Sequence, residues 1–200
     1  MTRKTIFILS CMTIFLAGYV ISTCFWDYGY VSTIAATIIA ALGIFGVWFQ
    51  LKKESDIKEA EFLMNYNFTF LTTEKFVQME HRLENAMNHA TPLNLSENDR
   101  QDLTDYLVYL ESLAPLVLNK MIRLEVVDDL FGYRYFIAVN NPEVQEEELC
   151  KDGQYYRGCF SLYRVWKDYR KTKDLPIPMM ENSLDKQPAF EKYARKKRWL

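Results

Sequence analysis

The sequence predicts an all-α protein in which a two-span transmembrane helical hairpin precedes a cytoplasmic helical bundle. Two uncharged apolar stretches near the start of the 200-residue chain are each long enough to cross a membrane as a helix. In the rest of the chain, apolar residues recur at helical intervals of three and four, and no stretch alternates as a strand would. We divide the chain into a hairpin at 1–53, a helical domain at 54–175 and a basic tail at 176–200.

Charge is strongly segregated along the chain. From Met1 to Lys53 there are five formal side-chain charges, whereas the remainder carries 20 basic and 25 acidic side chains. The average composition therefore hides an apolar head joined to a charged body.

The stretch Val31–Leu51 is the clearest membrane helix. Its 21 residues contain no formal charge and no proline. As a helix it would be about 31 Å long, which matches the hydrocarbon thickness of a bilayer. Strands rarely exceed about ten residues, so the β-branched residues in this stretch do not favour a strand.

A first span is predicted at Thr5–Trp26, which is 22 residues long and uncharged. The alternatives are a cleaved signal peptide, because Arg3 and Lys4 precede the stretch, and lipoprotein cleavage before Cys24. The apolar run exceeds the usual length of such signals and no A-x-A site follows it, so a retained span is favoured.

Aromatic and basic residues near the ends of both stretches indicate the membrane interfaces and the orientation. The predicted interface residues are Trp26, Tyr28, Tyr30, Trp48, Lys52 and Lys53. Basic residues precede the first span and follow the second, and the loop between the spans has none. The positive-inside rule then places both termini in the cytoplasm, with the hairpin in the membrane.

The second span also carries a stripe of small residues at Ser32, Ala36, Ala40 and Gly43. Such a stripe allows two helices to approach closely. The partner is either the first span of the same chain or a second copy in a homo-oligomer. Because no ionisable residue lies within either span, a pore is not favoured.

In the body, local signals mark several helix boundaries. The stretch Lys53–Ala90, with residues at helical spacing from Phe62 to Met87, predicts one long helix, or two helices joined near Thr72–Thr73. Ser96 and Asp99 resemble a capping box, and Pro115 predicts a kink or restart. A further helix is expected to be interrupted at Gly132 and closed by Asn140-Asn141-Pro142.

The stretch 153–173 predicts a helix with an aromatic side and a charged side. Its apolar face consists of Tyr156, Cys159, Tyr163, Trp166 and Tyr169. Its charged face consists of Arg157, Arg164, Lys167 and Lys171. This separation is typical of an amphipathic helix that covers a core.

Two stretches of the body, YLVYLESLAPLVLNKMIRLEVVDDLFGYRYF and CFSLYRVWKDYRK, resemble a family of small bacterial membrane-anchored proteins of unknown function. The shared pattern is an aromatic-rich helix with a central Glu111, an acidic turn before an aromatic pair, and a helix with Arg and Trp. The resemblance covers about Lys58–Lys173. It implies a location in the bacterial inner membrane and an all-helical cytoplasmic domain without a defined activity. It also associates the chain with phage-defence or prophage-exclusion components.

Glu111 is the acid of most interest, because it lies within an otherwise apolar run. A buried carboxylate there could have a perturbed pKa and serve a functional site. Alternatively, Arg123, Arg134 or Arg164 pairs with it inside the bundle, and this structural reading is favoured.

No metal or cofactor site is predicted. His81 and Glu84 lie three apart in EHRLE, but a carboxylate-histidine metal centre needs ligands from several helices. Cys11, Cys24, Cys150 and Cys159 form no CxxC pair and are read as ordinary thiols. Phosphate-loop and hydrolase motifs are also missing from the sequence, so an enzyme is not favoured.

The tail predicts contact with membrane lipid. Residues 54–152 carry 8 basic and 20 acidic side chains, whereas residues 153–200 carry 12 basic and 5 acidic ones. Lys196, Lys197, Arg198 and Trp199 suit an anionic leaflet. A solvated tail, or one folded back on the acidic half, is the alternative. The acidic body does not favour nucleic acid as a partner.

These observations predict a membrane-anchored interaction or scaffold protein with an unidentified protein partner. The alternatives are a membrane-perturbing effector and an enzyme that uses buried carboxylates such as Glu111.

Overall fold

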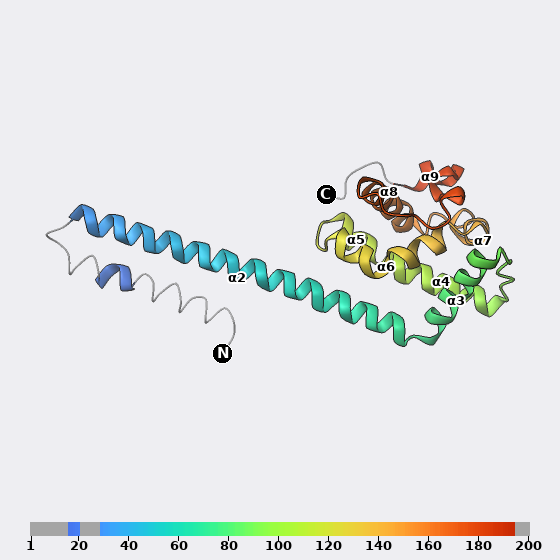
Figure 1. Ribbon diagram of the computed structural model, residues 1–200, viewed down its shortest axis with the longest axis horizontal. Coiled ribbons are helices and arrows are strands. Elements are labelled where there is room, and N and C mark those ends of the chain that lie inside the picture. Colours follow the sequence, from blue (N-terminus) through green and yellow to red (C-terminus); the bar gives the residue numbers. More distant parts are fainter. Residues whose placement is uncertain (1–15, 21–28, 195–200) are drawn as a thin grey trace. The chain divides into compact units, whose positions relative to one another are not determined.

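The computed structural model describes residues 16–20 and 29–194 (Figure 1). All regular structure in these ranges is helical, which confirms the all-α prediction. The chain divides into two compact units, Met1–Glu61 and Phe62–Leu200. Of the first predicted span, only residues 16–20 lie within the described ranges, and they are helical. The two-span hairpin is therefore not supported by the structure and stays a prediction.

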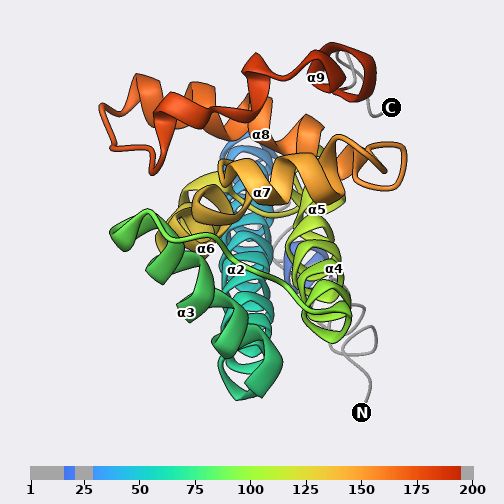
Figure 2. The same ribbon diagram turned by 90° about the vertical axis from the view of Figure 1, so that its right-hand side faces the viewer.

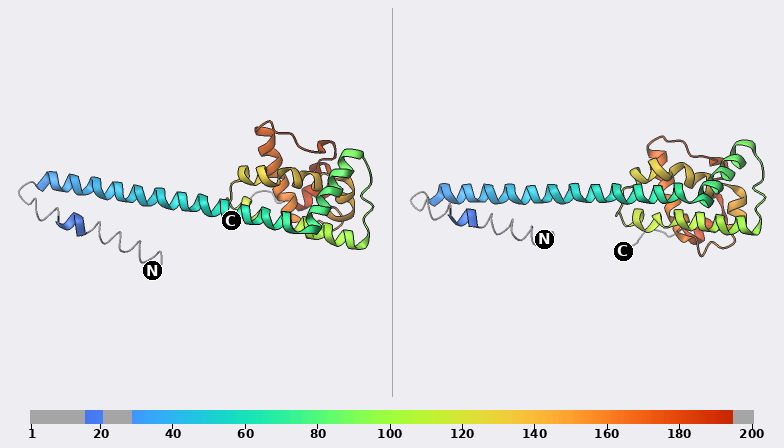
Figure 3. Two further views of the ribbon diagram at one scale, coloured as in Figure 1. Left: turned by 60° about the horizontal axis from the view of Figure 1, so that its bottom comes forward. Right: turned by 90° about the horizontal axis from the view of Figure 1, so that it is seen from below.

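Helix α2 runs from Gly29 to Thr72 over 44 residues and is continuous throughout (Figure 3). In the described part of the chain it is the one helix that is long and apolar enough to cross a membrane, and none of its apolar window is buried. Leu42, Ile44 and Phe45 are 67%, 72% and 65% exposed. A core helix of a soluble protein would bury such residues.

The boundary between α2 and α3 lies at Thr73, so the two-helix alternative for this region is correct. The hydroxyl of Thr72 donates to Phe68 O at 2.9 Å, and that of Thr73 donates to Thr69 O at 2.7 Å. Such bonds to the preceding turn compete with helix propagation, and Thr73 is extended. Helix α3 then spans Glu74–His89 and ends at Ala90 in the left-handed region.

The two sequence signals in the next segment are confirmed. Helix α4 spans Glu97–Glu111 and begins with the predicted capping box between Ser96 and Asp99. Hydrogen bonds from Ser96, together with Arg82, lower the pKa of Asp99 to about 2. After α4 the chain restarts as α5, Leu113–Leu118, which contains Pro115.

Helix α6 spans Leu124–Val139 without a break, so the predicted interruption at Gly132 is wrong. A β-carbon on Gly132 would lie 2.6 Å from Asp128 Oδ1 and would also meet the guanidinium of Arg170. Glycine is needed here because another side chain crosses close to the helix. The predicted closure holds, since α6 ends at Asn140 and Asn141 caps the short helix α7, Pro142–Val144.

The remaining elements surround helix α8, Arg157–Thr172. A π-helical turn, η2 (Gln145–Leu149), precedes it, and η3 (Met180–Asn182), η4 (Leu184–Lys186) and α9 (Pro188–Tyr193) follow. Helix α8 contacts α4, α5 and α6, and also η4 and α9. Figure 2 shows the C-terminal elements in red next to α8, with α3 at the opposite edge of this unit.

Aromatic side chains form the centre of the body. The rings of Tyr135 and Trp166 stack at 4.7 Å, and Phe136 meets Trp166 at 5.8 Å. Beside them, Asp128 Oδ1 accepts hydrogen bonds from Trp166 Nε1 at 2.5 Å and Arg170 Nε at 2.6 Å. The side chains of Asp128 and Arg170 are 5% and 11% exposed, so this ion pair lies inside the core.

We expect Asp128→Asn to destabilise the body by about 3 kcal/mol, because it leaves the Arg170 guanidinium buried without its counter-charge. The matched control is Asp129→Asn, since Asp129 is the exposed neighbour on the same helix. Denaturant unfolding of the full chain in detergent measures the difference. Equal midpoints for the two variants would contradict the assigned role.

Candidate functional site

The predicted membrane-interface residues that fall in the described ranges lie on α2. Trp48 is 54% exposed, and the Lys52 ammonium lies 5.6 Å from the centre of its ring. The side chains of Lys52 and Lys53 are exposed. Tyr30 and Ser32 lie in α2, but their side chains are not described. The other predicted residues lie outside the described ranges, namely Trp26, Tyr28, Lys196, Lys197, Arg198 and Trp199.

The rest of the small-residue stripe also lies on α2. Ala40 is exposed, whereas Ala36 and Gly43 have intermediate exposure. Their spacing of four and three places them on one face of the helix. The small side chains leave room for the backbone of a second helix.

Glu111, the predicted buried acid, is half-buried at the end of α4 and caps another helix. Its Oε1 accepts a hydrogen bond from Gly158 N at 2.5 Å, and the amide of Cys159 also bonds to the carboxylate. These amides belong to the first turn of α8, where Tyr156 provides no side-chain cap. A carboxylate at this place satisfies free amides and interacts favourably with the helix dipole.

Glycine at position 158 allows the Glu111 carboxylate to approach α8. A β-carbon there would lie 2.5 Å from Glu111 Cγ and 2.6 Å from Oε1.

The predicted pairing of Glu111 with Arg134 or Arg164 is wrong. Arg134 pairs with Glu80 at 2.9 Å, and Arg164 lies 3.4 Å from Glu191.

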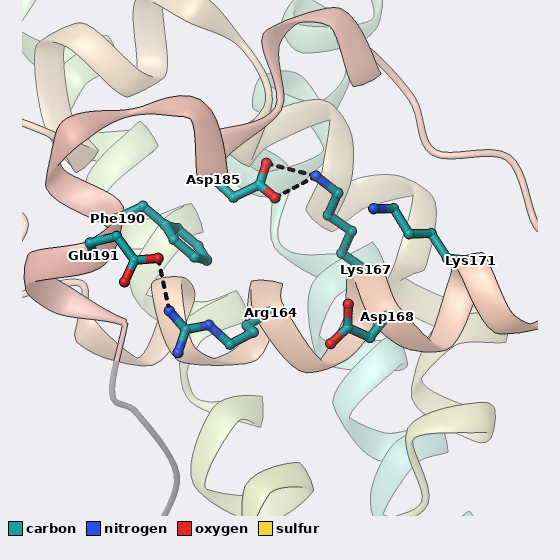
Figure 4. Close-up of a pocket in the computed structure, with 7 residues that line it drawn as sticks. All are labelled: Arg164, Lys167, Asp168, Lys171, Asp185, Phe190 and Glu191. Atoms are coloured by element: carbon teal, nitrogen blue, oxygen red, sulfur yellow. Dashed lines mark hydrogen bonds and ion pairs between the residues drawn. The ribbon is translucent and has the colours of Figure 1, made fainter.

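A groove of about 430 Å³ lies between α8 and the elements that follow it (Figure 4). Its lining residues are Arg164, Lys167, Asp168, Lys171, Asp185, Phe190 and Glu191. The Lys167 ammonium contacts both oxygens of Asp185, at 2.5 and 2.7 Å. The Arg164 guanidinium lies over the Phe190 ring at 5.2 Å. Ion pairs and a cation–π contact across this groove therefore hold the C-terminal segment against α8.

Lys167, which the sequence places on the charged face of α8, is buried. Its residue exposure is 6%, and Ser183 Oγ accepts a further hydrogen bond from its ammonium at 2.8 Å. Burying this charge is tolerable because Asp185 and Ser183 satisfy it. The same contacts lower the pKa of the Asp185 carboxyl, although burial acts in the opposite direction.

The first part of the predicted tail, residues 176–194, folds back on the body. Asn140 Nδ2 donates to Pro178 O at 2.8 Å, and its Oδ1 accepts from Leu184 N at 3.1 Å. Gln145 Nε2 donates to Asn182 O at 2.6 Å. This part therefore folds back, but it covers α8 of the basic half as well as Asn140 and Gln145 of the acidic half.

Other candidate ligands stay apart in the described ranges. His81 Nδ1 lies 3.5 Å from Glu84 on an exposed helix face. Cys159 is buried and Cys150 is half-buried, both are free thiols, and burial raises the pKa of each. Cys11 and Cys24 lie outside these ranges. No group of three metal-binding side chains comes together among residues 16–20 and 29–194.

Sequence reasoning missed the Asp128–Arg170 pair and the Lys167–Asp185 pair. The only signal for the first was an acid inside the apolar run EVVDDLF, with an Arg four residues after Trp166. The second pair joins α8 to a segment expected to be a tail, so its sequence spacing carried no signal.

Comparison with protein-family models, curated proteins and solved structures finds no match to the chain. The resemblance to a bacterial membrane-anchored family therefore stays a prediction.

We expect Glu111 to make the stability of the body depend on pH. Burial raises the pKa of its carboxyl above the ordinary value of 4.5, with the α8 amides acting in the opposite direction. The folded protein then holds this proton more tightly than the unfolded chain does. The stabilisation is complete below the ordinary pKa and is lost as the pH rises through the raised value.

The measurement is a series of unfolding midpoints over this pH window for the wild type and Glu111→Gln. The variant cannot ionise, so its profile should lack the decline. Glu146→Gln, at an exposed acid, should keep it. Identical pH slopes for the wild type and Glu111→Gln would refute the assignment.

Proposed function

We propose that the chain is a membrane-anchored interaction protein, with α2 as an anchor and the helical body as a cytoplasmic binding module. The observation that carries this proposal is the apolar window of α2, none of which is buried. Large apolar side chains that stay exposed along a whole helix face need either a membrane or a partner surface.

The residue pattern at the end of that window supports the membrane. The Lys52 ammonium over the Trp48 ring combines an amphipathic aromatic group with a cation, as residues at a bilayer interface commonly do. Lys52 and Lys53 lie after the apolar window, which supports a cytoplasmic location for the residues that follow. The two-span inner-membrane hairpin, with Thr5–Trp26 as the first span, is the finer form of the proposal.

The contacts of Glu111 support an interaction module over a carboxylate enzyme. Its oxygen is engaged by amides of α8, which is sufficient to explain a buried acid at this position. The family resemblance adds a context, namely phage defence or exclusion, in which a membrane-tethered helical domain would act by contacting another protein.

Topology is the decisive experiment. A reporter that is active only outside the cytoplasm should be active when fused after Gly29 and silent when fused after Leu200. Cell fractionation should also recover the full chain with membranes after an alkaline wash. An active reporter after Leu200 would contradict the two-span form, and release of the chain by the wash would contradict the anchor itself.

The small-residue stripe predicts self-association if a second copy, rather than the first span, covers it. The double change Ala36→Leu and Ala40→Leu should then convert an oligomer to a monomer, because the larger side chains block close helix approach. The mass of the detergent-solubilised chain is the readout. Ala41→Leu adds one leucine on another face of the helix and serves as the control. A wild type that is already monomeric contradicts this prediction.

A further inference from the structure

A second groove, of about 340 Å³, lies between α4 and the loop before α8. It is lined by Thr104, Val108, Glu148, Asp152, Tyr155 and Tyr156. Val108 and Tyr155 are 51% and 71% exposed, so the groove offers apolar and aromatic surface to a ligand. Unlike the groove on α8, its lining contains two carboxylates and no cation.

The two carboxylates are held differently. Glu148 Oε2 accepts a hydrogen bond from the Tyr156 hydroxyl at 3.0 Å, which fixes it at the groove wall. The Asp152 side chain has no hydrogen-bond or ion-pair partner within the described residues. Arg100 pairs with the neighbouring Glu147 and also attracts Glu148 at longer range, so Asp152 is the groove carboxylate that no cation among the described residues pairs with. The groove therefore suits a cationic segment with an aromatic or apolar side chain.

The end of helix α9 lies close to this groove. Helix α9 ends at Tyr193, and a β-carbon on Gly153 would lie 2.5 Å from atoms of the Tyr193 ring. Ala194 is buried, at 3% exposure. The chain therefore leaves α9 beside Gly153, which is the residue next to Asp152 in the sequence. Six further residues can span about 20 Å, which is sufficient to follow a groove of this size.

We propose that residues 195–200 of the same chain dock in this groove. They read Arg-Lys-Lys-Arg-Trp-Leu, so four cations meet Glu148 and Asp152, and Trp199 and Leu200 meet Tyr155 and Val108. An Arg or Lys side chain over the exposed Tyr155 ring adds a cation–π contact. Because the segment is attached next to the groove, its effective concentration there is in the millimolar range.

Docking in this groove withholds the same four cations from an anionic membrane surface. Lipid headgroups are the competing partner, since each cation near such a surface gains attraction. When no membrane is present, the Asp152 carboxylate provides the counter-charge for these cations, and this favours docking of the segment in the groove. The inference does not depend on the proposed anchor function.

Zero-length carbodiimide cross-linking of the full chain in an uncharged detergent tests this proposal. The reagent joins a lysine amine to a carboxylate only when the two are in contact. Mass spectrometry should find Lys196 or Lys197 joined to Asp152 or Glu148 within one chain. Glu146, an exposed acid on the same π-helical turn that does not line the groove, should give little product.

Tyr155→Ala should lower the yield about fivefold, the loss expected for one cation–π or stacking contact. It keeps both carboxylates, and because Tyr155 is largely exposed the fold should be unaffected. Phe68→Ala, at a 66% exposed aromatic residue outside the groove, should have no effect. High salt should lower the yield in all samples.

Several outcomes would overturn the proposal. Equal cross-linking to Glu146 would show a tail without a preferred site. Products only between differently isotope-labelled chains would place the segment on a second copy. No cross-linked product in detergent, together with binding of the chain to anionic vesicles that Tyr155→Ala does not change, would show that the segment binds lipid instead of the groove.

Discussion

Asp128 is a carboxylate in the interior of the body, and it accepts hydrogen bonds from both Trp166 and Arg170 of α8. A buried charge left without partners costs several kcal/mol, so α6 and α8 are held in the one register in which both donors reach it. That register also stacks Trp166 on Tyr135 and brings Arg170 over the face of α6 at Gly132. The electrostatic contact thus selects the packing of the aromatic core.

The position of α8 in turn determines the rest of the body. Its first turn lies under the Glu111 carboxylate, which connects α8 to the end of α4. Near its last turn, Arg170 Nη1 donates to Pro176 O at 2.6 Å and turns the chain back along the helix. Lys167 then binds Asp185 on the returning segment. Each of these contacts uses α8 as the common element, so a shift of this helix would disturb all of them.

The features that could be predicted from the sequence depend on local chemistry. The capping box at Ser96, the restart at Pro115 and the break at Thr73 each follow from a side chain acting on its own or the neighbouring turn. Gly132 was misread because a glycine in a helix can mark either a break or a close approach. Only the distant Arg170 decides between them.

The candidate site shows the same limit. Glu111 could be selected from the sequence, because an acid within an apolar run needs a partner. The partner is a pair of backbone amides, and backbone groups have no signature in a sequence. Lys167 could not be selected from the sequence, since its four-carbon stem allows either a solvated or a buried ammonium. Asp185, 18 positions along the chain, determines which of these occurs.

The end of α2 belongs to the core of the body. Leu63 and Phe70 are 1% and 0% exposed there. The Tyr66 and Tyr109 rings stack at 4.1 Å, and each hydroxyl donates to the backbone carbonyl of the other residue. The second compact unit accordingly begins at Phe62, before these residues. The body core is therefore complete only when the last turns of α2 are present.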